Sequence, residues 1–379
     1  MAKLGEVCTI VSGSTPKTSV TSYWDGNIKW ITPAELNEDT FYIMDSVRHI
    51  TEEGKEKTGL SYLPTGTVIL SSRAPIGKTA IAGCKMCCNQ GFKNLICSDA
   101  IYNEYLYFFL KSKTDYLNSL GRGATFKEIS KSIVENIEIP LPEVNQQKEI
   151  AEKFKKLEQL ISLRKQQLAK LDELVKARFV EMFGESEYPC NSLISLIIEG
   201  AGLSYGIVQP GDDGTGDMGV LRPVDFADGK IKTDSIKYID RSLGDGFKKT
   251  ELNGNELLIT VRGTTGITAL TDSRFKGMNV TRGIAVIRYD EKKIDPIYLN
   301  EYIKMEKSQQ YIKEHTRGAT LQQINLSELR DLEVVIPPLP LQRVFATFVE
   351  RVDQQKQTVQ QSFEKLELMK KALMQEYFG

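Results

Sequence analysis

The sequence lacks any long hydrophobic segment. It contains no run of eighteen apolar residues, and a membrane-spanning helix requires about that length. Its first residues, MAKLGEVCTIVSGSTP, contain neither a sustained apolar stretch nor a cleavage site of small residues. We therefore expect a cytoplasmic protein that does not enter a membrane.

Histidine and cysteine, the common ligands of zinc, are scarce. The chain has two histidines, His49 and His315, and six cysteines, of which only Cys84, Cys87 and Cys88 lie close together. This C-x-x-C-C arrangement could hold zinc, but a second ligand pair is missing. The cysteines also lack the regular spacing of a disulfide framework. We expect reduced cysteines in a strand or turn, and no metal site.

Net charge and catalytic motifs are also nearly absent. The 49 Lys and Arg residues oppose 50 Asp and Glu residues, for a net charge of −1, so any DNA-binding face must be a local patch. The sequence has no Asn- or Asp-Pro-Pro-aromatic motif, no G-x-x-x-x-G-K-[ST] phosphate loop and no nuclease-like carboxylate cluster. We therefore expect no catalytic residues and no cofactor in this chain.

What the chain does contain is an internal repeat. The tetrapeptide RGAT occurs at 122–125 and at 317–320, an offset of 317 − 122 = 195 residues. At this offset, without a gap, other identical residues align: Ile129 with Ile324, Glu138 with Glu333, Pro142 with Pro337, Gln147 with Gln342, Ala151 with Ala346, Leu171 with Leu366, and Phe-Gly at 183–184 with Phe-Gly at 378–379. A weaker upstream match aligns Arg73 with Arg262 and Gly77 with Gly266. The chain is therefore a tandem duplication.

Each repeat combines a globular part with a helical part. We expect globular parts at 1–142 and 187–337, followed by helical segments at 143–186 and 338–379. Short β-prone runs bounded by turn residues, such as TVILSS and IAVIRY, predict strands, and helical spacing of apolar residues predicts helices over 103–120 and 296–314. The fold class is α+β, with two tandem mixed domains and more than one core.

The helical segments predict an intramolecular pair. The stretch from Lys148 to Phe183 contains no Gly or Pro and should form one long helix. Apolar residues follow one face of each segment at helical or heptad spacing. These expected core positions are Ile150, Phe154, Leu157, Ile161, Leu168, Leu171, Val175, Phe345, Val352, Val359, Leu366 and Leu373. An antiparallel coiled-coil pair would place one globular part at each end, related by a pseudo-twofold axis.

These motifs resemble a known family. IPLPEVNQQKEIA and VIPPLPLQRVFA are similar to the proline-rich starts of the helices in specificity subunits of type I restriction-modification enzymes, and RGAT before and FG after each helix agree with them. The sequence departs from this pattern at Glu143, where the second repeat has Pro338, and at Asn145, where it has Pro340. These differences leave undetermined the local geometry at the start of each helix.

The resemblance implies a function without catalysis. Each globular part would be a target-recognition domain that reads one half of a bipartite, asymmetric double-stranded DNA sequence. The helices would set the gap between the halves and bind two methyltransferase subunits, and restriction subunits would join for cleavage. S-adenosylmethionine, ATP and magnesium would bind those partners.

Residue chemistry on turns gives candidate DNA contacts, because Arg suits guanine, Asn and Gln suit adenine, and Ser and Thr suit phosphates. In the first globular part these are Ser14, Thr15, Arg73, Lys78, Asn89, Gln90, Lys93, Arg122 and Thr125. In the second they are Tyr205, Gln209, Arg222, Arg262, Thr264, Asn279, Arg282, Arg317 and Thr320. Each could instead be a solvated side chain or a turn former.

Two alternatives remain for the recurring residues and two for the whole chain. Arg73 and Arg262 could bond carbonyls at a strand end, and RGAT could cap a helix through its threonine. The whole chain could instead be a scaffold whose helices and globular parts bind only proteins. A self-contained endonuclease or methyltransferase is the other possibility, although the chain leaves no room for a catalytic domain.

Overall fold

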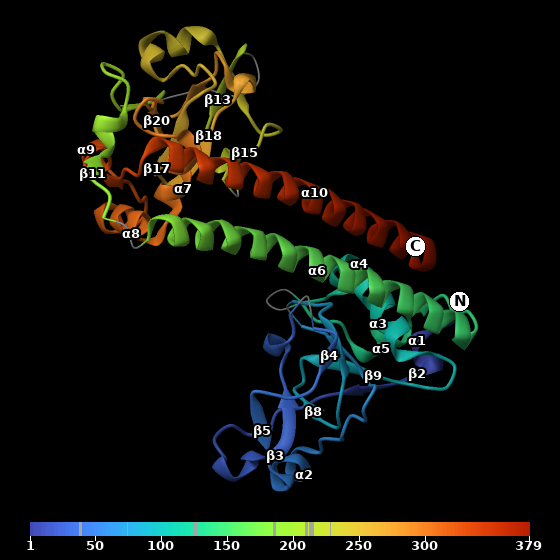
Figure 1. Ribbon diagram of the computed structural model, residues 1–379. Helices are drawn as coiled ribbons and strands as arrows, with labels where there is room; N and C mark the ends of the chain where they lie inside the picture. Colours follow the sequence, from blue (N-terminus) through green and yellow to red (C-terminus); the bar gives the residue numbers. More distant parts are fainter. Residues whose placement is uncertain are drawn as a thin grey trace. The chain divides into compact units, whose positions relative to one another are not determined.

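The computed structural model describes residues 1–37, 40–73, 75–123, 127–184, 187–208, 211, 216–227 and 229–379. The chain divides into two compact units, shown with their elements in Figure 1. Unit 1 contains Met1–Gln166 and Gln360–Gly379, and unit 2 contains Gln167–Val359. Each long helix therefore contributes to both units. The proposed limits of the recognition domains stay a prediction.

Unit 1 is built on a five-stranded sheet. Its strand order is β2 (Cys8–Ser12), β9 (Phe92–Cys97), β6 (Val68–Ser71), β7 (Thr79–Ala82) and β4 (Tyr42–Ile43). A second sheet has the order β5 (Arg48–Ile50), β3 (Trp24–Ile31) and β8 (Cys87–Cys88), and β1 (Ala2–Lys3) pairs with β10 (Glu138–Ile139). Every residue of β6 and β7 is buried, as expected for strands covered on both faces. The helices are α1 (Leu4–Val7), α2 (Glu52–Thr58), α3 (Asn103–Ser112), α4 (Thr114–Leu120) and α5 (Lys131–Glu135).

Unit 2 repeats this plan. Its main sheet has the order β12 (Ser204–Tyr205), β20 (Ile284–Ile287), β17 (Leu257–Arg262) and β18 (Thr264–Leu270). The smaller sheets are β16 (Lys237–Ile239), β13 (Met218–Leu221) and β19 (Asn279–Val280), then β11 (Cys190–Ser192) with β21 (Glu333–Val335), and β14 (Phe226–Ala227) with β15 (Lys230–Ile231). The α-helices are α7 (Pro296–Lys304), α8 (Glu306–His315) and α9 (Leu326–Arg330). Both units are α+β, as predicted.

The aromatic helix of each repeat packs in the core of its unit. Tyr105, Phe108 and Phe109 of α3 are at most 1% exposed, so the apolar residues at helical spacing in the predicted helix 103–120 pack in the core. A hydrogen bond from a tyrosine hydroxyl of this helix to a backbone carbonyl also recurs in both units. Tyr105 donates to the carbonyl of Pro140 at 2.9 Å, and Tyr298 of α7 donates to the carbonyl of Val335 at 2.9 Å. The duplication therefore preserves a specific polar contact as well as the fold.

The two long helices begin and end at equivalent positions. Helix α6 spans Val144–Phe183 and α10 spans Leu339–Phe378, with offsets of 339 − 144 = 195 and 378 − 183 = 195. Helix α6 thus begins four residues before the predicted start at Lys148. The differences at 143/338 and 145/340 do not change where the helix begins. Proline is compatible with a first helical turn, whose N–H groups have no partner within the helix.

Within each unit the helical segments run antiparallel. In unit 1, Phe154 stacks on Phe378 with ring centroids 5.6 Å apart, and Lys370 pairs with Glu158 at 2.8 Å. In unit 2, Lys356 pairs with Asp172 at 2.6 Å. Nine of the expected core positions are buried: Ile150, Phe154, Leu157, Ile161, Leu171, Val175, Phe345, Val352 and Val359. Leu168, Leu366 and Leu373 are partly exposed.

A buried glutamine joins each long helix to its globular part. Gln147 accepts a hydrogen bond from the backbone N–H of Tyr102 at 2.8 Å and donates to the carbonyl of Pro142 at 2.8 Å. Gln342 likewise accepts from the N–H of Asp295 at 2.8 Å and donates to the carbonyl of Pro337 at 2.7 Å. Neither glutamine is exposed. This explains why the same glutamine occurs in both repeats.

Two residues of the cysteine cluster lie in a strand, in agreement with the expected strand or turn. Cys87 and Cys88 form β8 and are buried, and Asn94 donates to the Cys88 sulfur at 3.0 Å. Burial raises the pKa of Cys87 to about 11. Among the described residues, no group of three or more His, Cys, Asp and Glu side chains is placed to hold a metal ion. No helix in the described ranges is long and apolar enough to cross a membrane.

Candidate nucleic-acid interface

In each unit the fold brings together two segments that the sequence separates. The strand-end arginine and the RGAT arginine both lie beside one residue of a following segment. Isolated antiparallel bridges join Arg73 and Arg122 to Glu128 in unit 1, and Arg262 and Arg317 to Gln323 in unit 2. Since 323 − 128 = 195, these are equivalent arrangements. The arginines selected by motif therefore share one site in each unit.

Backbone hydrogen bonds hold this site together. In unit 1, Arg122 and Glu128 exchange N–H···O bonds of 3.0 and 2.9 Å, and the N–H of Ile129 donates to the carbonyl of Ser72 at 3.0 Å. In unit 2, Arg317 and Gln323 exchange two bonds of 2.8 Å, and Ile324 donates to Val261 at 3.0 Å. These hydrogen bonds connect the segment that contains Arg122 to the end of β6, and the segment that contains Arg317 to the end of β17.

The glycine of RGAT is required by backbone conformation. Gly123 has a φ of 126° and Gly318 a φ of 104°, a region that side chains disfavour. A Cβ at Gly318 would also lie 2.3 Å from the carbonyl oxygen of Leu321. The helix-capping alternative is wrong for Thr320, because α9 begins at Leu326 and its N-cap is Asn325. Thr125 lies outside the described residues.

Side-chain charges differ between the two sites. In unit 1 the Glu128 carboxylate accepts from Nε of Arg73 at 2.9 Å and from Nζ of Lys93 at 3.2 Å. Burial raises the pKa of Glu128, but hydrogen bonds and charge from Lys93 and Arg73 outweigh it, so the pKa lies below 4.5. In unit 2 the equivalent Gln323 has no charge, and Arg317 is 3.6 Å from Glu328.

Several candidates are accessible in the folded units. Arg122, Arg282, Thr264 and Thr320 are exposed, and the Arg317 side chain is 77% exposed. Within the described part of the chain, the side chains of Arg122 and Arg282 have no hydrogen-bond or ion-pair partner. Arginines in such positions can reach phosphates or base edges.

A second group of candidates meets at one corner of unit 1. The N–H of Ser14 donates to the carbonyl of Cys88 at 3.1 Å, and the Thr15 hydroxyl donates to the Gln90 amide oxygen. The Asn89 side chain accepts from the N–H of Gly91 at 2.8 Å and so holds its own turn. Gln90 is exposed, whereas Ser14, Thr15 and Asn89 are partly exposed. The sequence selected these residues separately, and the fold brings them together.

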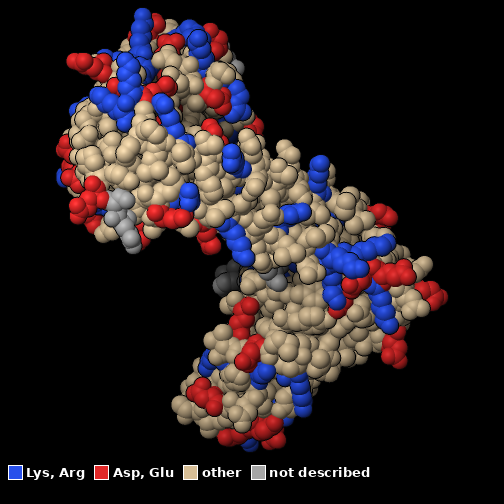
Figure 2. All heavy atoms as spheres, in the orientation of Figure 1, with Lys and Arg blue, Asp and Glu red and all other residues tan. Residues whose placement is uncertain are grey.

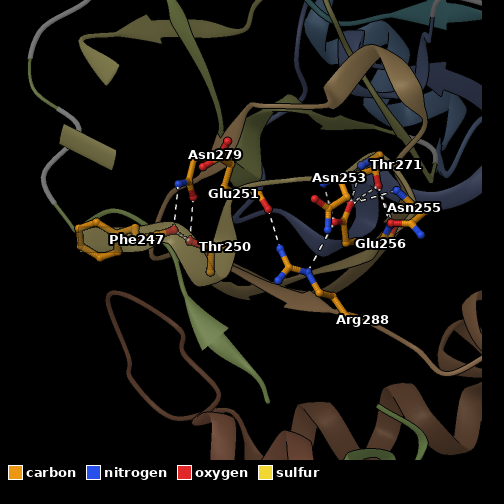
Figure 3. A network of polar contacts seen from close by, with 10 residues as sticks. Phe247, Thr250, Glu251, Asn253, Asn255, Glu256, Thr271, Asn279 and Arg288 are labelled. Carbon is orange, nitrogen blue, oxygen red and sulfur yellow. Dashed lines mark hydrogen bonds and ion pairs between the residues drawn. The ribbon is translucent and has the colours of Figure 1, made fainter. Parts of the chain in front are cut away.

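Other candidates point into the protein. Asn279 is 1% exposed; its amide oxygen accepts from the Thr250 hydroxyl at 2.8 Å and its nitrogen donates to the Phe247 carbonyl at 3.2 Å (Figure 3). Lys93 is 7% exposed and paired with Glu128. In the folded units both side chains are buried and bonded internally, as buried polar groups usually are, and their contact with DNA stays a prediction.

Three further candidates have internal partners or partial exposure. Lys78 donates to the carbonyl of Leu36 at 2.7 Å, and Arg222 forms an ion pair with the buried Asp225 at 3.0 Å. Tyr205 lies in β12 and packs partly against the core of unit 2. Gln209 lies outside the described residues.

Sequence reasoning missed Glu128. It lies three residues after the RGAT at 122–125, opposite Gln323 in the gapless repeat alignment, and this charge difference was visible in the sequence. Its partners were not, because Arg73 is 55 residues and Lys93 35 residues away. On the face drawn in Figure 2, acidic and basic side chains are largely interspersed within each unit. Any DNA-binding surface must therefore depend on local groups of side chains, such as the one around Glu128.

The fold and the site define a duplicated protein whose two α+β units carry equivalent arginine-bearing segments. A family model described as the type I restriction modification DNA specificity domain matches residues 1–173 and 215–368. The chain therefore belongs to the family of type I restriction-modification DNA specificity subunits. The resemblance stated from the sequence is confirmed.

Individual relatives agree with this assignment. The chain is 29% identical over 376 residues to the MjaIX specificity subunit of Methanocaldococcus jannaschii, covering 92% of this chain and 85% of that protein. It is 22% identical over 280 residues to the EcoBI specificity subunit of Escherichia coli, covering 66% and 59%.

Solved structures share the fold. A chain from a study of complex assembly and conformational transition in a type I R-M system aligns with a TM-score of 0.64 and 17% identity over 100% of this chain and 96% of that one. The S subunit from M. genitalium aligns with a TM-score of 0.55 and 16% identity over 100% and 95%.

Proposed function

We propose that this chain is the DNA sequence-recognition subunit of a type I restriction-modification complex and binds a bipartite, asymmetric target. Unit 1 reads one half-site and unit 2 the other. The specificity-domain match over both units carries this proposal. The equivalent arrangement of the strand-end and RGAT arginines in each unit supports it. Because Glu128 of unit 1 is replaced by Gln323 in unit 2, the two half-sites need not have the same sequence.

The exposed arginines supply the binding chemistry. Arg122 and Arg317 occupy equivalent loops and extend into solvent, so each can bind a phosphate or a base edge of its half-site. The near-zero net charge means that binding depends on these local groups and on partner subunits. Specificity subunits have no catalytic activity of their own, so catalysis belongs to the partners.

Methyltransferase and restriction subunits are the proposed protein partners. Two methyltransferase subunits would bind the long helices and carry S-adenosylmethionine, while restriction subunits would use ATP and magnesium. The exposed leucines of α6, including Leu160, Leu163 and Leu174, support a protein-binding role for this helix, because each is at least 45% exposed.

The decisive experiment is to express the chain with its methyltransferase partner and map methylated adenines across the host DNA by single-molecule sequencing. We expect a split motif with a fixed gap, and its loss when this chain is omitted. A motif that persists without this chain would contradict the proposal and favour the scaffold alternative. Methylation by this chain alone would favour the self-contained enzyme.

The matched variants Arg122→Ala and Arg317→Ala assign a half-site to each unit. We expect each to lower methylation through one half of the motif only. A phosphate contact would weaken all sequences by a similar factor, and a base contact would relax one position at a cost of about 1–3 kcal/mol. If both variants affected the same half-site, the one-half-per-unit arrangement would be wrong.

A further inference from the structure

Glu128 places a carboxylate inside a set of basic side chains on unit 1. Its partners are Arg73, whose side chain is 46% exposed, and Lys93, whose side chain is 8% exposed. A carboxylate beside a DNA-binding arginine disfavours phosphate binding, because like charges repel each other. Glu128 is therefore unexpected if Arg73 serves only to hold the DNA backbone.

The geometry leaves the outer end of Arg73 free. Its Nε donates to Oε2 of Glu128 at 2.9 Å, and within the described residues the two terminal amino groups of its guanidinium have no partner. Lys93 binds the other carboxylate oxygen at 3.2 Å and is held near Ser72. The buried lysine thus orients the carboxylate, and the carboxylate orients the arginine.

An arginine held in this way suits guanine. The two terminal amino groups can donate together to O6 and N7 on the major-groove edge of guanine. That edge carries no net charge, so the Glu128 carboxylate repels it less than it repels a phosphate. The carboxylate therefore favours a base over the backbone as the ligand of Arg73.

We propose that Glu128 is a specificity-determining residue of unit 1, which orients Arg73 to bind a guanine in the half-site that this unit reads. The proposal rests on the proposed function, since it needs unit 1 to bind DNA. Glu128 is a positioning residue that acts through Arg73, and Lys93 fixes its carboxylate.

Unit 2 supplies an internal comparison. Arg262 aligns with Arg73, Gln323 with Glu128, and Ala285 takes the place of Lys93 in the strand register, because Leu70 pairs with Lys93 and Ile259 with Ala285. Within the residues that the structure describes, Arg262 has no acidic partner. Nothing equivalent to the Lys93–Glu128 pair orients it, so we assign Arg262 to a phosphate contact.

The test compares four variants in complex with the methyltransferase: Arg73→Ala, Arg73→Lys, Glu128→Gln and, as the matched control, Gln323→Glu. Binding is measured by competition against the mapped target, against targets with one base pair replaced, and against unrelated DNA at several salt concentrations. Thermal melting of each variant checks folding. Arg73→Lys keeps the positive charge but loses the planar guanidinium, so it tests the proposal even where Glu128→Gln fails to fold.

We expect Arg73→Ala, Arg73→Lys and Glu128→Gln to lower discrimination at the same G·C pair by about tenfold, which is typical of a bidentate base contact. Glu128→Gln should also bind unrelated DNA more tightly, with a salt slope steeper by about 0.9 because Arg73 gains a phosphate. Gln323→Glu should leave discrimination at that pair unchanged and weaken binding to unrelated DNA.

Equal weakening on every sequence, with no change in discrimination, would overturn the proposal and make Glu128 merely structural. Unchanged discrimination at every base pair in Arg73→Lys would also overturn it. Both results presuppose that the unmodified complex selects its target. If that complex bound all DNA equally, the proposed function itself would fail, and the inference with it.

Discussion

At the scale of single residues, buried polar groups stabilise each unit through bonds to distant segments. Asn279 joins β19 to the segment around Thr250 (Figure 3). The Glu256 carboxylate accepts hydrogen bonds from the backbone N–H groups of residues 253, 254 and 255, and Nε of Arg288 lies 3.6 Å from its Oε1. Such groups cost free energy when one partner is removed, because the other remains buried without a bond.

Asn279→Ala should therefore destabilise unit 2 without changing base discrimination. We expect a loss of about 1–3 kcal/mol, since the Thr250 hydroxyl and the Phe247 carbonyl lose their partner. Hydrogen exchange measured by mass spectrometry should show faster exchange in β19 and β20. The exposed Arg282→Ala is the control and should leave exchange unchanged; equal effects of the two variants would contradict the structural role of Asn279.

The lowered pKa of Glu128 predicts a pH dependence of stability. A carboxylate whose pKa is lower in the folded state stabilises that state above its unfolded pKa of about 4.5, and this contribution is lost as pH falls through the folded value. The stability difference between the unmodified protein and Glu128→Gln should therefore shrink below about pH 4.5. Urea unfolding at several pH values measures it, with the exposed Glu138→Gln as control. A difference that is constant with pH would contradict the ion pairing.

At the scale of elements, a buried glutamine holds the first turn of each long helix against its globular part. An apolar residue at this position would leave a backbone N–H and at least one carbonyl without partners. The sequence showed Gln147 and Gln342 as a recurring pair, but it did not show that they bind the segments before α3 and α7. The bonding partner explains the recurrence.

Gln147→Ala should destabilise unit 1 by about 2 kcal/mol, because the half-buried Tyr102 N–H and Pro142 carbonyl lose their partner. Both tryptophans, Trp24 and Trp30, lie in unit 1, so fluorescence during urea unfolding reports on this unit. The neighbouring exposed Gln146→Ala is the matched control. Equal midpoints for the two variants would show that the bonds of Gln147 contribute little.

At the scale of the whole molecule, each unit includes a segment that is distant in sequence. The ring of Phe378 is 2% exposed and lies 5.3 Å from Tyr105 and 5.8 Å from Phe109, so the end of α10 completes the core of unit 1. Its repeat counterpart, Phe183, packs against Tyr298 and Phe345 in unit 2. The recurrent Phe-Gly therefore marks a core position.

Phe378→Ala should destabilise unit 1 by about 3–5 kcal/mol, the usual cost of emptying a buried aromatic site. The loss should appear in the tryptophan fluorescence, although Trp24 and Trp30 lie more than 340 residues earlier in the chain. Leu368→Ala on the same helix, where the side chain is 68% exposed, should have little effect. An unchanged fluorescence midpoint in Phe378→Ala would contradict the role of this residue in unit 1.

Patterns that are local or repeated could be predicted from the sequence alone. The duplication, the α+β class, the long helices and the buried aromatic face of α3 follow from periodicity and from self-similarity, which need no knowledge of distant contacts. The start of α6 was placed four residues too late, because the first turn of a helix carries no apolar periodicity. The family likewise followed from the order of recurring motifs.

Only the tertiary structure decided which candidate residues face solvent. It placed Arg73 and Lys93 on one carboxylate, 55 and 35 residues away. It also buried Asn279 against the 3-10 helix Arg241–Thr250, which the sequence gives no reason to connect with it. Burial and side-chain pairing depend on long-range contacts, whereas residue type and local spacing do not. The sequence by itself thus determined the repeated architecture and the class of protein, and the tertiary structure decided which of its polar residues face solvent and which are used to hold the fold.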